Sequence, residues 1–152
     1  MPTFNSLGDL LQALPGAIDR GLRRAAEEIA IDVQIRAQDK LGDYQPGWPQ
    51  LAEATQQERA SLGYSPNDPL FRGGILRSKI EKAVDRHSDG YTAVIGSSAP
   101  QARIQELGGV NSGRPWADDI PPRPYLAPAV VEEEDKIQDH VAFFVAEEIG
   151  KL

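Results

Sequence analysis

The feature that most constrains the fold is a long stretch with helical periodicity near the start of the chain. Apolar residues recur there at three- and four-residue steps, with charged and amide residues between them: Ile18, Leu22, Ala25, Ile29, Val33 and Ala37. This spacing aligns one apolar stripe along an α-helix. It predicts an amphipathic helix over residues 17–41, preceded by a mobile lead, residues 1–15, with one amphipathic turn that ends at Pro15.

A second helical pattern closes the sequence and predicts another long amphipathic helix over residues 128–152. Its apolar positions are Val130, Val131, Ile137, Val141, Phe144, Val145 and Ile149. Alternating apolar residues between the two helical patterns predict strands near residues 79–86 and 91–96. Asp89-Gly90 between these strands is typical of a tight hairpin turn. We therefore expect an α+β fold, in which two long helices pack on a small antiparallel sheet built around a β-hairpin.

The segment between the first helix and the hairpin, residues 42–74, is rich in proline and glycine and predicts an extended arm or long loop. A short helical pattern lies inside it, over residues 51–62, and Trp48 is expected to be a packing anchor. We expect this arm to become ordered on assembly, because it has few apolar anchors of its own. A short helix is expected before Gly108, followed by a polar loop.

Composition limits the class of protein. A chain of 152 residues with 40% hydrophobic residues is long enough for one globular domain, here residues 1–152. The net charge of −7 disfavours a nonspecific electrostatic grip on nucleic acid. There is no cysteine, which removes disulfides and thiolate chemistry. No stretch approaches the length of an apolar membrane span, so we expect a soluble chain without a membrane partner.

Catalytic chemistry has little support in the sequence. The two histidines, His87 and His140, lie in the predicted turn and on the last predicted helix, where His140 is expected at the edge of the apolar stripe. No nucleophile elbow, phosphate loop or dinucleotide fingerprint occurs. We therefore predict no enzyme activity and no catalytic, cofactor-binding or metal site. The alternative of a small metal-dependent hydrolase would use Asp118, Asp119 and His140.

The stretch Ile120-Pro-Pro-Arg-Pro-Tyr-Leu-Ala-Pro-Ala-Val130 places four prolines at the start of the last predicted helix. Prolines fix φ and lower the entropy lost on docking, so this segment could present Arg123 and Tyr125 to a partner. Alternatively, the prolines set the direction of the helix, and Tyr125 and Leu126 pack inward. The full set of candidate interface residues is Trp48, Arg72, Trp116, Pro121, Arg123, Pro124 and Tyr125.

Four segments follow one another along the chain: GWPQLAEAT, LFRGGILRSKI, AVIGSSAPQARIQELGG and IPPRPYLAPAV. In this order and spacing they resemble the phage virion morphogenesis (tail-completion) family, which includes Mu-like tail-completion proteins and related head-tail joining proteins. The matching residues are Gly47, Trp48, Leu51, Thr55, Gly74, Leu76, Ser78, Gly96, Ser97, Leu107, Gly108, Pro121, Arg123, Pro124, Tyr125 and Leu126. The resemblance extends over residues 17–150.

The resemblance implies a structural role in the virion, in a neck or tail-completion protein made in the host cytoplasm that joins the tail to the DNA-filled head. Family members form homo-oligomeric rings, commonly hexamers, between tail terminator or tail tube proteins and head-completion or connector proteins. An acidic inner face would let DNA pass without specific binding. A monomeric adaptor that binds one protein through the proline segment is a further alternative.

Overall fold

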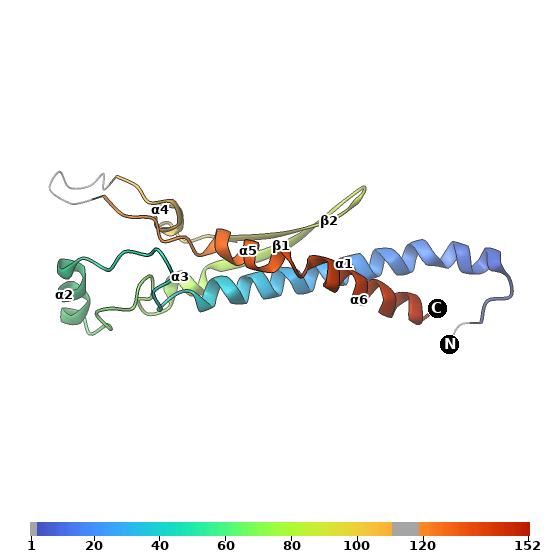
Figure 1. Cartoon of the computed structure of the whole chain (residues 1–152), viewed down its shortest axis with the longest axis horizontal. Coiled ribbons are helices and arrows are strands. Elements are labelled where there is room, and N and C mark those ends of the chain that lie inside the picture. The colour runs from blue at the N-terminus through green and yellow to red at the C-terminus, as the bar shows by residue number, and fades with distance from the viewer. Residues whose placement is uncertain (1–2, 111–118) are drawn as a thin grey trace. The chain divides into compact units, whose positions relative to one another are not determined.

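A computed structural model of the chain describes residues 3–110 and 119–152 and contains six helices and two strands among them (Figure 1). The elements in chain order are α1 Leu7–Asp39, α2 Glu53–Ser61, α3 Ile75–Ser78, β1 Ile80–His87, β2 Gly90–Ser97, α4 Ala102–Leu107, α5 Leu126–Glu134 and α6 Ile137–Gly150. β1 and β2 pair with each other as a hairpin. The fold is α+β, as the sequence predicts.

The hairpin and the short helices agree with the sequence prediction. Both strands begin and end within a residue or two of the expected positions. Ser88 and Asp89 form the turn, and Gly90 follows with φ of 153°. α2 occupies the helical pattern inside the loop of residues 42–74. α4 ends at Gly108, also as predicted.

α1 differs from the prediction, because it starts at Leu7 and continues through Pro15. The expected mobile lead is therefore helical from Leu7 onward. Proline removes one backbone N–H, here the donor to the carbonyl of Leu11, but the neighbouring turns remain bonded. The start is fixed earlier by Ser6, whose hydroxyl oxygen accepts a hydrogen bond from the Asp9 N–H at 3.1 Å, as an N-cap does.

The last predicted helix is also different, since it is divided into α5 and α6. The Lys136 N–H bonds to the Glu133 carbonyl at 3.0 Å, three residues back rather than four, so the chain tightens before α6 begins. Acidic residues crowd the end of α5, where the helix dipole disfavours negative charge. α5 begins at Leu126, which places Pro128 in the first turn, where no backbone N–H is required.

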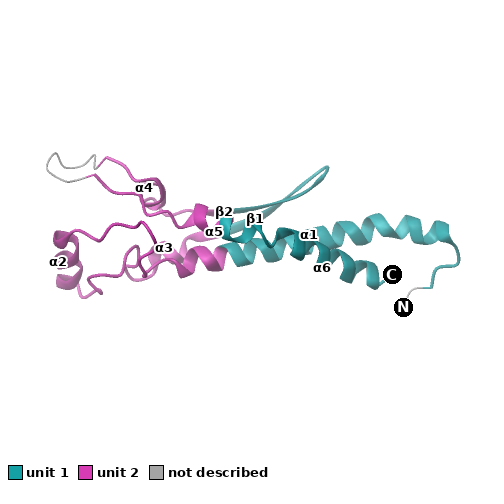
Figure 2. Cartoon of the chain, in the orientation of Figure 1, with its two compact units in different colours: residues 1–33, 82–94, 131–152 teal, residues 34–81, 95–130 magenta. Residues whose placement is uncertain are grey.

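The chain divides into two compact units (Figure 2). Unit 1 comprises residues 1–33, 82–94 and 131–152, and unit 2 comprises residues 34–81 and 95–130. Among the described residues, no helix combines the length and apolar character needed to cross a membrane.

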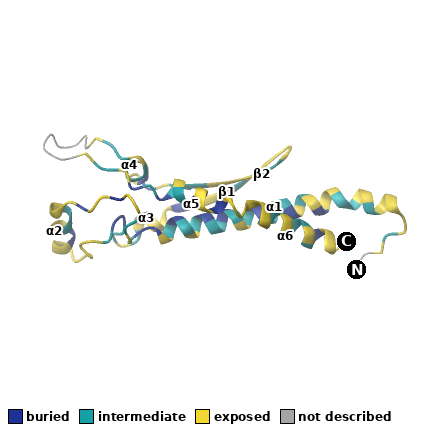
Figure 3. Ribbon diagram, viewed as in Figure 1, coloured by how far each residue is buried: buried dark blue, intermediate teal, exposed yellow. Residues whose placement is uncertain are grey.

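Unit 1 is built on a seam of small residues along α1, formed by Ala17, Gly21 and Ala25, all buried (Figure 3). A Cβ atom added to Gly21 would lie 2.6 Å from the Cα of Val145, so the backbone of α6 packs directly on this glycine. Most of the predicted stripe faces inward, since Ala25, Val33 and Ala37 are buried and Leu22 and Ile29 are half-buried, whereas Ile18 is exposed. Small side chains allow the two helices to approach closely.

Unit 2 surrounds the segment that was expected to be an arm. Trp48 and Leu51 are buried there, and so is Leu70. The Gly42 N–H donates to the Pro69 carbonyl at 2.8 Å, which closes the loop at its base. Residues 42–74 thus have buried apolar anchors within the single chain, and their ordering on assembly stays a prediction.

Candidate assembly surfaces

The N-terminus of α5 is held by a glutamate from α4. The Oε2 of Glu106 accepts hydrogen bonds from the Tyr125 N–H at 2.7 Å and the Leu126 N–H at 2.9 Å. Its Oε1 accepts a third from the Ala127 N–H at 2.9 Å. These donors have no partner within the helix, and a carboxylate is favoured at the positive end of the helix dipole. Glu106 therefore caps α5 from a distant position in the sequence.

Arg123 joins the proline segment to the loop after α1. Its Nη2 donates to the carbonyl oxygens of Pro49 at 2.8 Å and Gln50 at 3.1 Å, and its Nε donates to Pro49 at 3.2 Å. The Arg123 N–H also donates to the Gln105 carbonyl at 2.7 Å. The residue is 5% exposed, and this burial lowers the pKa of its guanidinium. The Arg123 guanidinium therefore makes its hydrogen bonds within unit 2.

Trp48 and Tyr125 complete the same interior. The Trp48 Nε1–H donates to the Pro124 carbonyl at 3.2 Å, and the indole is buried. Tyr125 is fully buried, and burial raises the pKa of its phenol. Trp48 is therefore the packing anchor that the sequence predicted.

These positions correct the proposed contact role of the proline segment. Arg123 and Tyr125 are not presented to a partner, because both side chains are buried in unit 2. The burial of Tyr125 agrees with the alternative interpretation, in which the prolines direct the helix and Tyr125 and Leu126 pack inward, and Leu126 is half-buried. Pro121 and Pro124 are half-buried beside them. Trp116 lies outside the described residues.

The backbone of the proline segment packs closely against Gly108. Its φ is +72°, and a Cβ atom there would lie 2.9 Å from the Ile120 carbonyl oxygen and from the Pro122 ring. Gly109 and Ile120 exchange two backbone hydrogen bonds of 2.9 and 2.8 Å next to this contact. Only glycine fits at position 108 without displacing the backbone of the proline segment.

A groove of about 880 Å³ opens on unit 2 between these elements. Its lining includes Arg59, Arg72, Arg123, Gln105 and Asp119. The Nη1 of Arg59 donates to the carbonyl oxygens of Asp68 at 2.7 Å and Phe71 at 2.9 Å, so Arg59 also serves the interior. Arg72 is half-exposed, 3.6 Å from Glu58 and over the ring of Tyr64. Of the candidate interface residues it remains the accessible charged one.

One row of exposed apolar residues lies on α1 in unit 1, and exposed apolar residues such as Leu62, Ile75 and Leu107 also occur in unit 2. Leu7, Leu11 and Ile18 are 71%, 56% and 40% exposed, and they follow one another at helical spacing along α1. We call these three residues the α1 stripe. Phe143 on α6 is 64% exposed as well. Sequence periodicity could have located the stripe, since Leu7 and Leu11 lie in the amphipathic turn predicted within residues 1–15. It could not show that nothing in the described part of the chain covers the stripe.

The hairpin offers a second exposed surface, which is mostly polar. Its residues between Lys82 and Val94 are mostly exposed on both faces, and the strands have no further strand beside them among the described residues. A two-stranded ribbon alone is marginally stable in water, and its outer edges carry unpaired backbone groups. Asp19 of α1 supports it by accepting hydrogen bonds from the Tyr91 hydroxyl at 3.0 Å and the Arg86 guanidinium at 3.2 Å.

Of the residues of the hydrolase alternative, Asp119 lines the groove of unit 2, His140 belongs to unit 1, and Asp118 lies outside the described residues. His87 is exposed in β1. His140 is half-buried, as expected for the edge of the apolar stripe, and its neighbours are Asp32 and Glu133.

The chain was compared with known proteins at three levels. No family model, no curated protein and no solved structure matches it.

Proposed function

We propose that this chain is a structural subunit of a tailed-phage virion, a tail-completion or neck protein that joins tail to head as part of a homo-oligomeric ring. Two independent features support the proposal. One is the order and spacing of the four motifs that resemble the tail-completion family. The other is an apolar surface in unit 1 that the described part of the subunit leaves uncovered.

The α1 stripe is the observation that carries the proposal. Large apolar side chains scattered singly over a surface are ordinary, but a row of three along one helix is a contiguous patch. Covering a leucine on such a row contributes roughly 1.5–3 kcal/mol. A second copy of the chain is the occupant we propose, because a ring subunit must present different surfaces to its two neighbours.

Several motif residues that carry the resemblance pack inside unit 2 and are separate from the α1 stripe in the sequence. Trp48, Gly108, Arg123 and Tyr125 all lie in unit 2 and interlock there through buried contacts. They account for the shape of unit 2 and leave contact with other subunits to other residues. This division supports a rigid assembly module, in which motif residues preserve the fold and the surface of unit 1 provides association.

The test is self-association of the untagged chain, measured by sedimentation velocity over a range of concentrations. Leu11→Glu places a charge in the α1 stripe, and Gln12→Glu places the same charge on the neighbouring exposed position as a matched control. We expect a ring-sized species for the parent chain and for Gln12→Glu. Leu11→Glu should weaken association about 10- to 100-fold, the equivalent of losing one buried leucine.

A second assay ties association to the virion. Tails that lack this protein are mixed with the chain and then with filled heads, and the yield of infectious particles is counted. Uptake of several copies per tail, followed by joining, is expected for the parent chain and much less for Leu11→Glu. A strict monomer that binds no tails would overturn the proposal, and a monomer that binds one tail protein would identify an adaptor instead.

A further inference from the structure

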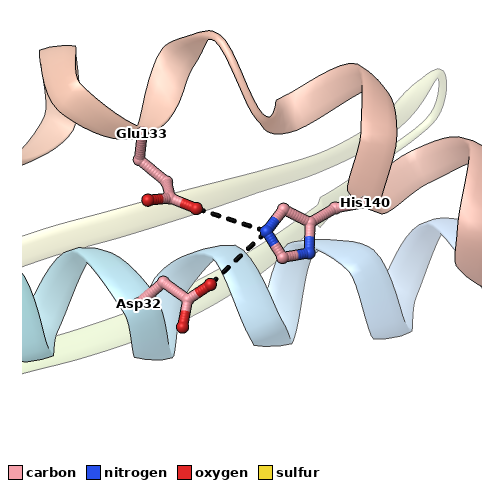
Figure 4. Close-up of side chains that lie close together, drawn as sticks. All are labelled: Asp32, Glu133 and His140. Atoms are coloured by element: carbon pink, nitrogen blue, oxygen red, sulfur yellow. Dashed lines mark hydrogen bonds and ion pairs between the residues drawn. The ribbon is translucent and has the colours of Figure 1, made fainter.

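Three side chains from three helices of unit 1 meet at one point (Figure 4). They are Asp32 of α1, Glu133 of α5 and His140 of α6. The Nε2 of His140 lies 3.2 Å from Glu133 Oε1 and 3.4 Å from Asp32 Oδ2. One ligand atom from each residue lies within 4.8 Å of the other two. The cluster therefore offers one nitrogen and two oxygen ligands to a shared point.

Burial makes this cluster unlike an ordinary surface group of charges. The Glu133 side chain is 1% exposed, so its carboxylate is held away from water, where a negative charge needs compensation. Lys136 Nζ lies 3.9 Å from Oε2, the other oxygen of this carboxylate, so Oε1 is the atom directed at His140. The Phe144 ring lies parallel to the His140 ring, with an interplanar angle of 6° and 6.4 Å between the ring centroids.

The separations match those within a metal coordination sphere. Zinc binds histidine nitrogen and carboxylate oxygen at about 2.0–2.2 Å, so neighbouring ligands in a tetrahedral site lie about 3.3–3.5 Å apart. The two distances from His140 Nε2, 3.2 and 3.4 Å, lie at this separation, and both are longer than a strong charge-assisted hydrogen bond. Modest movement of Asp32 and Glu133 toward each other would complete the triangle.

We propose that Asp32, Glu133 and His140 bind a divalent transition ion of the zinc class. Imidazole suits such ions, whereas magnesium and calcium prefer sites made of oxygen alone. Three protein ligands leave a fourth position for water, and the side chains of Asp32 and His140, 39% and 23% exposed, leave it a path to solvent. The ion would link α1 to α5 and α6 within unit 1.

The competing interpretation is a protonated histidine between two carboxylates with no ion. Both arrangements use the same atoms, but only the metal site binds zinc in a fixed ratio. Metal binding also requires a deprotonated imidazole, so zinc affinity should fall from neutral to mildly acidic pH.

The experiment uses the untagged full chain, stripped with a chelator and titrated calorimetrically with zinc chloride. We expect one ion per chain, with magnesium chloride giving no binding. Thermal unfolding should shift upward by about 5–10 °C when free zinc is a hundredfold above its dissociation constant. Cobalt(II) supplies a second readout, because its visible absorption reports tetrahedral coordination without depending on stability.

Two pairs of variants locate the site. His140→Ala should abolish the cobalt spectrum and the zinc shift, whereas His87→Ala, at the only other histidine, should keep both. Asp32→Asn should weaken zinc binding at least tenfold, whereas Asp135→Asn, at a nearby exposed acid, should not. Absence of stoichiometric zinc binding by the parent chain, or binding that survives His140→Ala, would overturn the proposal. These outcomes are independent of the ring assembly proposed above.

Discussion

The two units of this chain are stabilised in different ways. Unit 2 is held by polar groups that reach inward: Arg59 and Arg123 donate to backbone carbonyls, and Glu106 accepts from three backbone N–H groups. Unit 1 is held by direct helix contact at Gly21 and by ion pairs at the helix surface, including Arg20 with Glu148 at 3.0 Å. Its large apolar residues lie partly outside, along the α1 stripe.

The difference indicates a division of tasks. Buried hydrogen-bonded side chains fix one arrangement of the loops, because leaving any of those groups unpaired is costly. A unit built in this way keeps its shape without a partner. A unit that leaves apolar rows exposed gains stability when those rows are covered. Under the proposed function, unit 2 would be the preformed block, and the α1 stripe of unit 1 would be the association surface.

The strongest way to break this comparison is Arg123→Met. Methionine keeps much of the side-chain volume but leaves the Pro49 and Gln50 carbonyls without their donor. We expect the free energy of unfolding to fall by about 2–4 kcal/mol, measured by urea denaturation.

Arg72→Met is the matched control for that variant. Arg72 lines the same groove but is half-exposed and pairs with Glu58 at the surface, so its loss should change stability by less than about 0.5 kcal/mol. Equal effects of the two variants would show that the interior of unit 2 does not depend on buried hydrogen bonds.

Gly21→Ala tests the close helix contact in unit 1. Alanine favours a helix over glycine by about 1 kcal/mol, but here its Cβ would meet the backbone of Val145 at 2.6 Å. Backbone atoms cannot turn aside, so we expect a net loss of about 1–2 kcal/mol in thermal or urea unfolding. Gly16→Ala, in the same helix with only the end of Arg20 at 3.5 Å, should stabilise the chain instead.

The sequence predicted the elements whose signal is local. The hairpin follows from alternation around Asp89-Gly90, and α4 from a short pattern closed by Gly108. The predictions differ from the structure where two local signals compete. Pro15 indicates the end of a segment, but the Ser6 cap begins α1 before it and the helix continues through the proline. The single final helix was read from apolar spacing, which does not register the crowded charges that separate α5 from α6.

The candidate sites were harder to predict for a physical reason. Arg123 and Tyr125 have the composition of interface residues, but their burial is decided by loops more than seventy positions earlier. The cluster of Asp32, Glu133 and His140 likewise combines positions separated by about a hundred residues. Only the spacing of Glu133 and His140, two helical turns apart, was visible in the sequence, and the break between α5 and α6 lies inside it.

Glu106→Gln sharpens the account of unit 2 with a smaller change. Glutamine keeps one acceptor oxygen but loses the second acceptor and the negative charge at the start of α5. We expect a loss of about 1 kcal/mol in urea unfolding. Glu134→Gln, at the other end of α5, removes a charge that opposes the helix dipole and should be neutral or slightly stabilising. Equal losses in both variants would rule out capping as the role of Glu106.

The smallest effect concerns the pH dependence of stability in unit 1. Hydrogen bonds from Lys151 and then Arg20 hold the pKa of Glu148 at about 2, below its ordinary value of 4.5, and Arg24 adds a further contact at 2.8 Å. A carboxyl group whose pKa is lower when folded stabilises the fold above its unfolded pKa. That contribution is complete above pH 4.5 and is lost as the pH falls toward about 2.

Glu148→Gln should therefore lower stability at neutral pH and flatten the decline in stability between pH 4.5 and about 2 in a pH series of urea unfolding curves. Glu28→Gln, at an exposed acid of α1, should leave the decline unchanged. Should the decline persist in Glu148→Gln, the ion pairs between α1 and α6 would contribute nothing measurable, and unit 1 would depend on the Gly21 contact alone.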